Sequence, residues 1–140
     1  MIQQVINPYN GSLVMERELL SGSIVDAIVE RGNTAQKVWK KVPLSERAEV
    51  CRRFIEIMLE QKELLGSEIT DLMGRPIRYT PNEIVGMADR AQTMIDIAEH
   101  SLADVSLPEK QGFHRFIRRE PIGLIFAIVP WNYPYLTAIN

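Results

Sequence analysis

The part of this sequence whose residue types and spacing could do chemistry is a short polar segment between two prolines. Residues 130–134 read Pro-Trp-Asn-Tyr-Pro and directly follow an apolar run over residues 122–129. Open α/β sheets bind ligands in loops at the carboxyl ends of their strands, and proline stiffens such a loop. A side-chain amide held in this way, here that of Asn132, can donate a hydrogen bond to a developing oxyanion. The residue types alone are equally compatible with a rigid turn around a packed tryptophan.

The other reactive side chains carry less chemistry in their spacing. Cys51 is the sole cysteine, so an intramolecular disulfide is excluded. Its place on the apolar stripe of a predicted helix indicates a small buried residue rather than a nucleophile. His100 and His114 do not share the spacing of metal ligands, so no metal site is predicted. The arginines that follow His114 could form a phosphate-binding patch, but their pattern is more typical of the solvated face of an edge strand. No glycine-rich nucleotide motif occurs.

Composition places the chain among ordinary globular proteins. Of 140 residues, 46% are hydrophobic and 24% are charged. The formal net charge of −2 gives no general attraction to nucleic acid or to an anionic membrane. The N-terminus lacks the pattern of a signal peptide, and the longest apolar run is too short to span a bilayer. These features predict a cytoplasmic protein that has neither nucleic acid nor a membrane as a partner.

The first half of the chain predicts a hairpin followed by helices. Asn10-Gly11 is a strong turn signal between two short strands, at residues 3–6 and 12–15. Gly32-Asn33 interrupts the first helical pattern, and Gly74 followed by Pro76 ends the third. Helical periodicity predicts helices over residues 23–40, from a Ser45 N-cap onward, and over residues 62–73.

The second half predicts one long helix and then strands. Thr80 and Glu83 have the spacing of a capping box, which predicts a helix that starts there and fades near Ala103. A period of two predicts a strand over residues 113–120. Residues 122–129 are apolar on both faces, which is typical of a buried strand in a parallel sheet. Such a strand needs neighbours that these residues do not supply, so we expect the sequence to be truncated.

At the Pro-Trp-Asn segment the chain resembles a known family. Residues 119–134 resemble a sequence block of the aldehyde dehydrogenase superfamily that ends in P-W-N-[FY]-P. Residues 7–11 resemble the family's early NP-x-(D/T/N)-G turn. Residues 71–76 resemble its E-x-G-K-P helix end, from which Arg75 departs together with Asp71 and Met73. The resemblance covers nearly the whole chain, and only the Pro-Trp-Asn block is diagnostic by itself.

The resemblance implies the fold. It implies an α/β architecture similar to part of an aldehyde dehydrogenase: an N-terminal hairpin with helices, one oligomerisation-type strand, and the first buried strand of a parallel cofactor-domain sheet. Residues 1–140 would then be the N-terminal part of the cofactor-binding domain. Residues 113–120 would belong to the arm through which family members form homo-oligomers.

The resemblance also implies a reaction and roles for particular residues. In the family, a cysteine thiolate attacks an aldehyde, the thiohemiacetal gives hydride to NAD or NADP, and a glutamate activates water to hydrolyse the thioester. Asn132 matches the asparagine that stabilises the tetrahedral oxyanion. Cofactor-lining positions match Ile128, Val129, Pro130 and Trp131, and substrate-tunnel positions match Tyr133 and Leu136.

The family's nucleophilic cysteine and general-base glutamate follow this block and have no counterpart within the 140 residues. The sequence therefore predicts the N-terminal part of an NAD(P)-dependent enzyme that oxidises a small-molecule aldehyde to a carboxylic acid. We expect these residues alone to be inactive and to bind no cofactor. Two alternatives stay open: a non-catalytic module that pairs with full-length subunits through residues 113–120, and a small protein that keeps part of the cofactor pocket.

Overall fold

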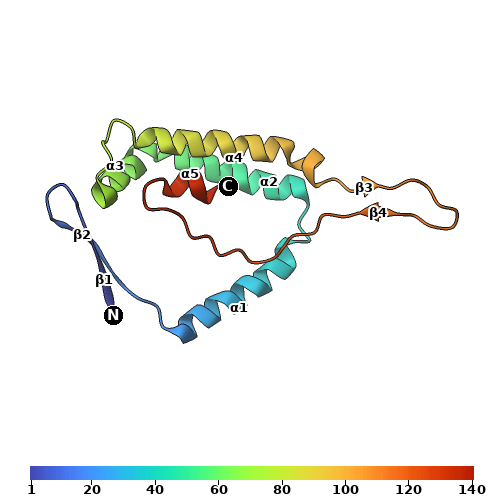
Figure 1. The fold of residues 1–140 in the computed structure, drawn as a ribbon, viewed down its shortest axis with the longest axis horizontal. Coiled ribbons are helices and arrows are strands. Elements are labelled where there is room, and N and C mark those ends of the chain that lie inside the picture. Colours follow the sequence, from blue (N-terminus) through green and yellow to red (C-terminus); the bar gives the residue numbers. More distant parts are fainter.

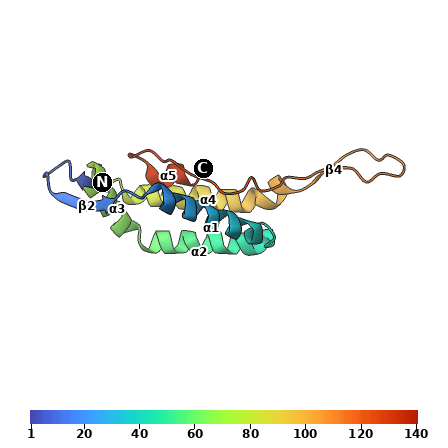
Figure 2. The ribbon, with the colours of Figure 1, turned by 90° about the horizontal axis from the view of Figure 1, so that it is seen from below.

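The computed structural model describes all residues, 1–140, as a helical layer from which two β-hairpins extend (Figure 1). Helices α2 and α4 lie side by side, with α3 at one end and α5 against α4, and the turned view shows a shallow molecule (Figure 2). The elements are β1 (Ile2–Ile6), β2 (Leu13–Glu18), α1 (Gly22–Trp39), α2 (Leu44–Glu60), α3 (Lys62–Met73), α4 (Pro81–Leu102), β3 (Val105–Ser106), β4 (Phe116–Ile117) and α5 (Pro134–Ala138).

The N-terminal hairpin is confirmed. Strands β1 and β2 pair antiparallel, with Ile2 opposite Glu18, so the second strand runs three residues beyond its predicted end. In the turn, the Asn10 side chain accepts a hydrogen bond from the backbone N–H of Ser12 at 2.9 Å. Gly11 has φ 72°, a left-handed conformation that glycine adopts without strain. The Asn-Gly signal therefore predicted the turn, but only Gly11 has a positive φ, and Asn10 contributes through its side chain.

The turn of the hairpin is attached to the end of α3. The buried Asn7 amide donates to the Asp71 carboxylate at 3.1 Å. Gly74 ends α3 in the left-handed conformation, with φ 80°. A Cβ at Gly74 would lie 2.9 Å from Cγ of Pro8, so only glycine allows this close approach. Sequence positions more than sixty residues apart are thereby fixed to each other.

The predicted helices are present. Helix α4 starts at Pro81, directly after Thr80, as predicted, whereas α2 starts earlier than predicted. Helix α1 runs unbroken through Gly32-Asn33, and Gly32 lies directly beneath the Leu124 side chain. Helix α2 begins at Leu44, one residue before the predicted cap Ser45, because Pro43 already sets the extended backbone there. No helix in the structure combines the length and the apolar character needed to cross a membrane.

The capping box predicted for α4 does not form. Thr80 has helical angles, φ −71° and ψ −37°, and makes no side-chain cap. Its hydroxyl donates instead to the Ile77 carbonyl at 3.1 Å. The Glu83 carboxylate makes no bond back to the helix start, because it is buried and pairs with Arg75 and the backbone N–H of Tyr135.

The core lies where α2, α3 and α4 meet. Its centre is Ile55 of α2 against Ala88 and Ala91 of α4, with Ile139 packed on this cluster. Cys51, predicted to be buried, is exposed. It lies one turn before Ile55, in an apolar groove that opens between α2 and α4.

Gly66 lets α3 approach the start of α4. A Cβ built there would lie 2.9 Å from the backbone nitrogen and from two ring atoms of Pro81, none of which can rotate away. We expect Gly66→Ala to destabilise the α3–α4 unit by about 1–3 kcal/mol. In Gly86→Ala the new methyl would meet only Leu136, at 3.8 Å, so this control should stabilise by about 0.5–1 kcal/mol. Native-state hydrogen exchange of the α3 and α4 amides measures the change in stability of each variant. A change of the same sign in both variants would contradict the expectation.

The strand predicted over residues 113–120 is shorter in the structure. Only Phe116–Ile117 forms β4, which pairs antiparallel with β3 in an arm that extends away from the helices (Figure 1). At the base of the arm, Arg118 pairs with Asp104 at 2.7 Å. This hydrogen bond lowers the pKa of the Asp104 carboxyl. The arm therefore has few backbone hydrogen bonds of its own, and a side-chain pair closes its base.

The prediction of a buried parallel strand over residues 122–129 is not met within this chain. The segment has no strand pairing, and the two sheets contain only β1–β2 and β3–β4. Its apolar side chains are open to solvent; Ile122, for example, is 95% exposed. The physical reason is that a strand exists only through hydrogen bonds to a neighbour, and no strand lies beside this segment. The segment is apolar, as its sequence indicates, but no other part of this chain buries it.

The solvent-accessible surface of the chain is much larger than that of a compact protein of the same mass. The chain exposes 11105 Å², of which much is apolar. A compact monomer of 16.0 kDa would expose about 7,400 Å². The excess is far larger than the variation between ordinary globular proteins, so broad apolar faces here lack a packing partner.

Candidate functional site

The predicted loop, residues 130–134, joins the exposed apolar segment to α5. Proline at the first position of α5 suits a helix start because that position needs no N–H donor. Leu136 lies over Gly86 of α4, and Ile139 packs on the core cluster. The loop is thus anchored on its carboxyl side, through α5, to the best-packed helix of the structure (Figure 1).

A buried glutamate holds the start of α5. The Glu83 side chain is fully buried and pairs with the Arg75 guanidinium at 2.6 Å. Its other carboxylate oxygen accepts hydrogen bonds from the backbone N–H groups of Tyr135, at 3.0 Å, and Leu136, at 3.5 Å. These amides are among the first of α5, which have no partner inside the helix. The carboxylate therefore satisfies both a cation and a helix start.

Arg75 contacts the loop as well. Its guanidinium carbon lies 4.3 Å from the centre of the Tyr133 ring, and its side chain is 17% exposed. Burial raises the pKa of the Tyr135 hydroxyl, and the carboxylates of Glu68 and Glu83 raise it further. The pair itself is largely buried, and a low local dielectric strengthens its electrostatic contacts.

The structure separates the predicted oxyanion donor, Asn132, from the two predicted tunnel positions, Tyr133 and Leu136. Asn132 is half-buried, and the hydrogen bonds of its neighbourhood use Tyr135, Leu136 and Asn140 but not its amide. Tyr133 lies under Arg75 and Leu136 over α4, so these two predicted tunnel positions face different neighbours.

The predicted cofactor positions are only partly brought together. Val129, Pro130 and Trp131 share the wall of a hollow of ≈ 420 Å³ with the N-terminal hairpin and the end of α3. Ile128 does not line this hollow and is 84% exposed. Most of the hollow's lining is apolar, so it presents a surface for a flat or apolar group rather than a set of reacting side chains.

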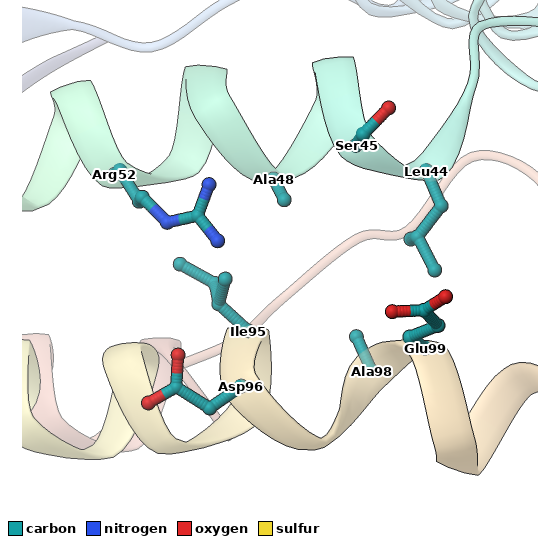
Figure 3. Close-up of a pocket in the computed structure, with 8 residues that line it drawn as sticks. All are labelled: Leu44, Ser45, Ala48, Arg52, Ile95, Asp96, Ala98 and Glu99. Atoms are coloured by element: carbon teal, nitrogen blue, oxygen red, sulfur yellow. The ribbon is translucent and has the colours of Figure 1, made fainter.

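A second hollow lies between α2 and α4, away from the loop (Figure 3). Its volume is ≈ 530 Å³, and Arg52 of α2 faces a gap that Asp96 and Glu99 of α4 also border. Arg52 already pairs with Glu49 of its own helix at 3.3 Å. No group of three or more His, Cys, Asp or Glu side chains is arranged to hold a metal ion anywhere in the chain. This hollow therefore brings together no reactive set.

Sequence reasoning missed Glu83 and Arg75 as parts of this region. It assigned Glu83 to a helix cap and noted Arg75 only as a departure from a family pattern. One signal was present: Glu83, Met87 and Ala91 recur every four residues, which places a carboxylate on the apolar face of a helix. A charge at such a position predicts a buried partner.

Comparison with known proteins identifies the family. The profile of the aldehyde dehydrogenase family matches residues 2–140. A succinate-semialdehyde dehydrogenase [NADP(+)] of Deinococcus radiodurans is 33% identical over 96% of this chain and 28% of its own length. Malonate-semialdehyde dehydrogenase 1 of Bacillus licheniformis is 27% identical over 98% of this chain and 28% of its own.

A solved structure agrees in fold. The NADP-dependent glyceraldehyde-3-phosphate dehydrogenase of Bacillus halodurans, complexed with NADP, matches with a TM-score of 0.89 and 27% identity, over 99% of this chain and 30% of its own. The chain belongs to the aldehyde dehydrogenase family, and the predicted fold class, a mixed α/β architecture similar to part of such an enzyme, is confirmed. It spans less than a third of the length of the relatives it matches.

Proposed function

We propose that this chain is the N-terminal part of the cofactor-binding domain of an NAD(P)-dependent aldehyde dehydrogenase that oxidises a small-molecule aldehyde to a carboxylic acid. The observation that carries the proposal is the Pro-Trp-Asn loop, whose asparagine amide is free while its carboxyl side is fixed to α4. The family membership and the names of the relatives support the same reaction.

In this proposal Asn132 supplies an oxyanion donor. An aldehyde attacked by a thiolate develops negative charge on its oxygen, and a preorganised amide stabilises that charge. Tyr133 and Leu136 line the path of the substrate.

Ile128, Val129, Pro130 and Trp131 contact the nucleotide, and their apolar, exposed side chains fit the face of such a group. NAD or NADP would accept the hydride when bound.

The 140 residues alone are proposed to be inactive and to bind neither nucleotide. Cys51 is their sole cysteine, and it lies on α2 among apolar side chains with no histidine in the groove. A thiol without a base and an oxyanion site is a weak nucleophile.

The test compares two proteins from the same gene. One is the protein of the complete reading frame and the other is the chain of residues 1–140. The expected result is aldehyde-dependent formation of NADH or NADPH by the complete protein only, and no calorimetric signal when NAD or NADP is titrated into the chain. Activity of the chain alone would contradict its proposed inactivity, and an inactive complete protein would contradict the dehydrogenase itself.

A second candidate function is pairing with other subunits through residues 113–120, which include β4 of the β3–β4 arm. The arm extends from the helices and has unpaired outer edges, which favour addition of a strand from another chain (Figure 1). Co-purification of the chain with an intact family member supports this function, and a monodisperse monomer in such a mixture counts against it.

A further inference from the structure

Glu83 fixes the backbone immediately after the Pro-Trp-Asn loop. Its carboxylate accepts from the N–H of Tyr135 at 3.0 Å and of Leu136 at 3.5 Å. Hydrogen bonds to an ionised acceptor are stronger than neutral ones, and here the acceptor is fully buried. Tyr135 is only three residues after Asn132, so a shift of this anchor moves the asparagine with it.

Arg75 holds the loop through a side-chain contact with Tyr133. One face of its guanidinium covers the Tyr133 ring at 4.3 Å, while one nitrogen pairs with Glu83 at 2.6 Å. A planar guanidinium can stack and pair at the same time, which the ammonium of lysine cannot do. Tyr133 directly follows Asn132. Arg75 therefore holds the ring next to the asparagine, and Glu83 holds the backbone at Tyr135.

Arg75 is itself held in place. It directly follows Gly74, which packs on Pro8, and the end of α3 is bonded to the hairpin through Asp71 and Asn7. A rigid support of this kind is what a group needs if its own contacts are to define a neighbour's position.

We propose that Glu83 and Arg75 are positioning residues for Asn132, which together hold its amide at the geometry that the oxyanion requires. The inference rests on the proposed role of Asn132 in the complete dehydrogenase. A displacement of about 1 Å can cost on the order of a hundredfold in rate, so the pair need not touch the substrate to matter.

The first test measures the anchor without any activity. Hydrogen–deuterium exchange of the peptide that contains Tyr135 and Leu136 is compared in the complete protein and its Glu83→Ala variant. We expect at least about tenfold faster exchange of these amides, and little change in Glu83→Gln, whose carbonyl can still accept. Glu99→Ala is the matched control, since Glu99 is exposed on the same helix. Unchanged exchange in Glu83→Ala would overturn the proposal.

The second test separates positioning from mere stability. Glu83→Ala is expected to lower kcat about ten- to a hundredfold with a smaller change in KM. In the background of Asn132→Ala, the same change should cost less than about twofold, because it acts through a residue that is already gone. Arg75→Lys should lower kcat by a smaller factor, and this loss should also shrink in the Asn132→Ala background. Arg78→Lys is the control: the Arg78 stack on Tyr79 is exposed, so kcat should not change.

Additive losses in the double variant would assign Glu83 a structural role only and overturn the proposal. An inactive wild-type protein would instead contradict the proposed dehydrogenase, and the exchange measurement would then decide alone whether Glu83 holds the loop. The milder Arg75→Lys variant, tested alone and in the Asn132→Ala background, covers the case in which Glu83→Ala fails to fold.

Discussion

Replacing Asn132 by alanine in the proposed complete dehydrogenase is expected to lower kcat about a hundred- to a thousandfold, with KM changed much less. The reason is that an oxyanion donor acts on charge that exists only near the transition state, so its loss spares substrate binding. The Asn132 amide suits this role because it has no partner within the chain, although its loop is fixed. Steady-state rates with the preferred aldehyde, at saturating NAD or NADP, measure the effect.

Asn140→Ala is the matched control for that prediction. The Asn140 side chain bonds Arg90 and the Leu136 carbonyl, so it is engaged in structure rather than free. Its removal should change kcat by less than about threefold, in line with the small effect of most surface substitutions. If Asn132→Ala keeps more than a tenth of the wild-type kcat while the control is unaffected, the oxyanion role is wrong.

Local signals in the sequence predicted local structure well. Asn10-Gly11 gave the hairpin turn, and Gly74 gave the end of α3, because both depend on backbone conformations that few residue types accept. The long helices follow from apolar periodicity. The start of α2 was predicted less well, since Pro43 and not a Ser45 cap precedes it. Helix α4 starts at Pro81 as predicted, but without the side-chain cap expected of Thr80.

The candidate site was predictable only in its central loop. The Pro-Trp-Asn segment is visible in the sequence, whereas its support comes from Glu83, which meets Tyr135 across 52 residues. A local sequence pattern does not predict a contact between residues so far apart. The only indication was a carboxylate on the apolar face of a helix. Residues 122–129 show the converse limit: their apolar pattern is plain, but a strand also needs a neighbour, which the pattern cannot provide.

Breaking the buried pair from the arginine side should have the largest effect on stability. Arg75→Met keeps most of the side-chain volume and leaves the Glu83 carboxylate buried without its cation. We expect a loss of about 3–5 kcal/mol in the free energy of unfolding of this region, the range seen when one partner of a buried ion pair is removed. Native-state hydrogen exchange of the α4 amides, in the complete protein, measures the loss.

Two comparisons decide whether the loss comes from the unpaired charge or from lost packing. Arg78→Met removes an exposed arginine and should cost no more than about 0.5 kcal/mol. Adding Glu83→Gln to Arg75→Met removes the charge but keeps an acceptor for the Tyr135 amide, so most of the stability should return. A double variant as unstable as the sum of its parts would show that Arg75 stabilises the fold by its contact with Tyr133 instead. The charge explanation would then fail, because an uncompensated carboxylate predicts recovery whenever the carboxylate is neutralised.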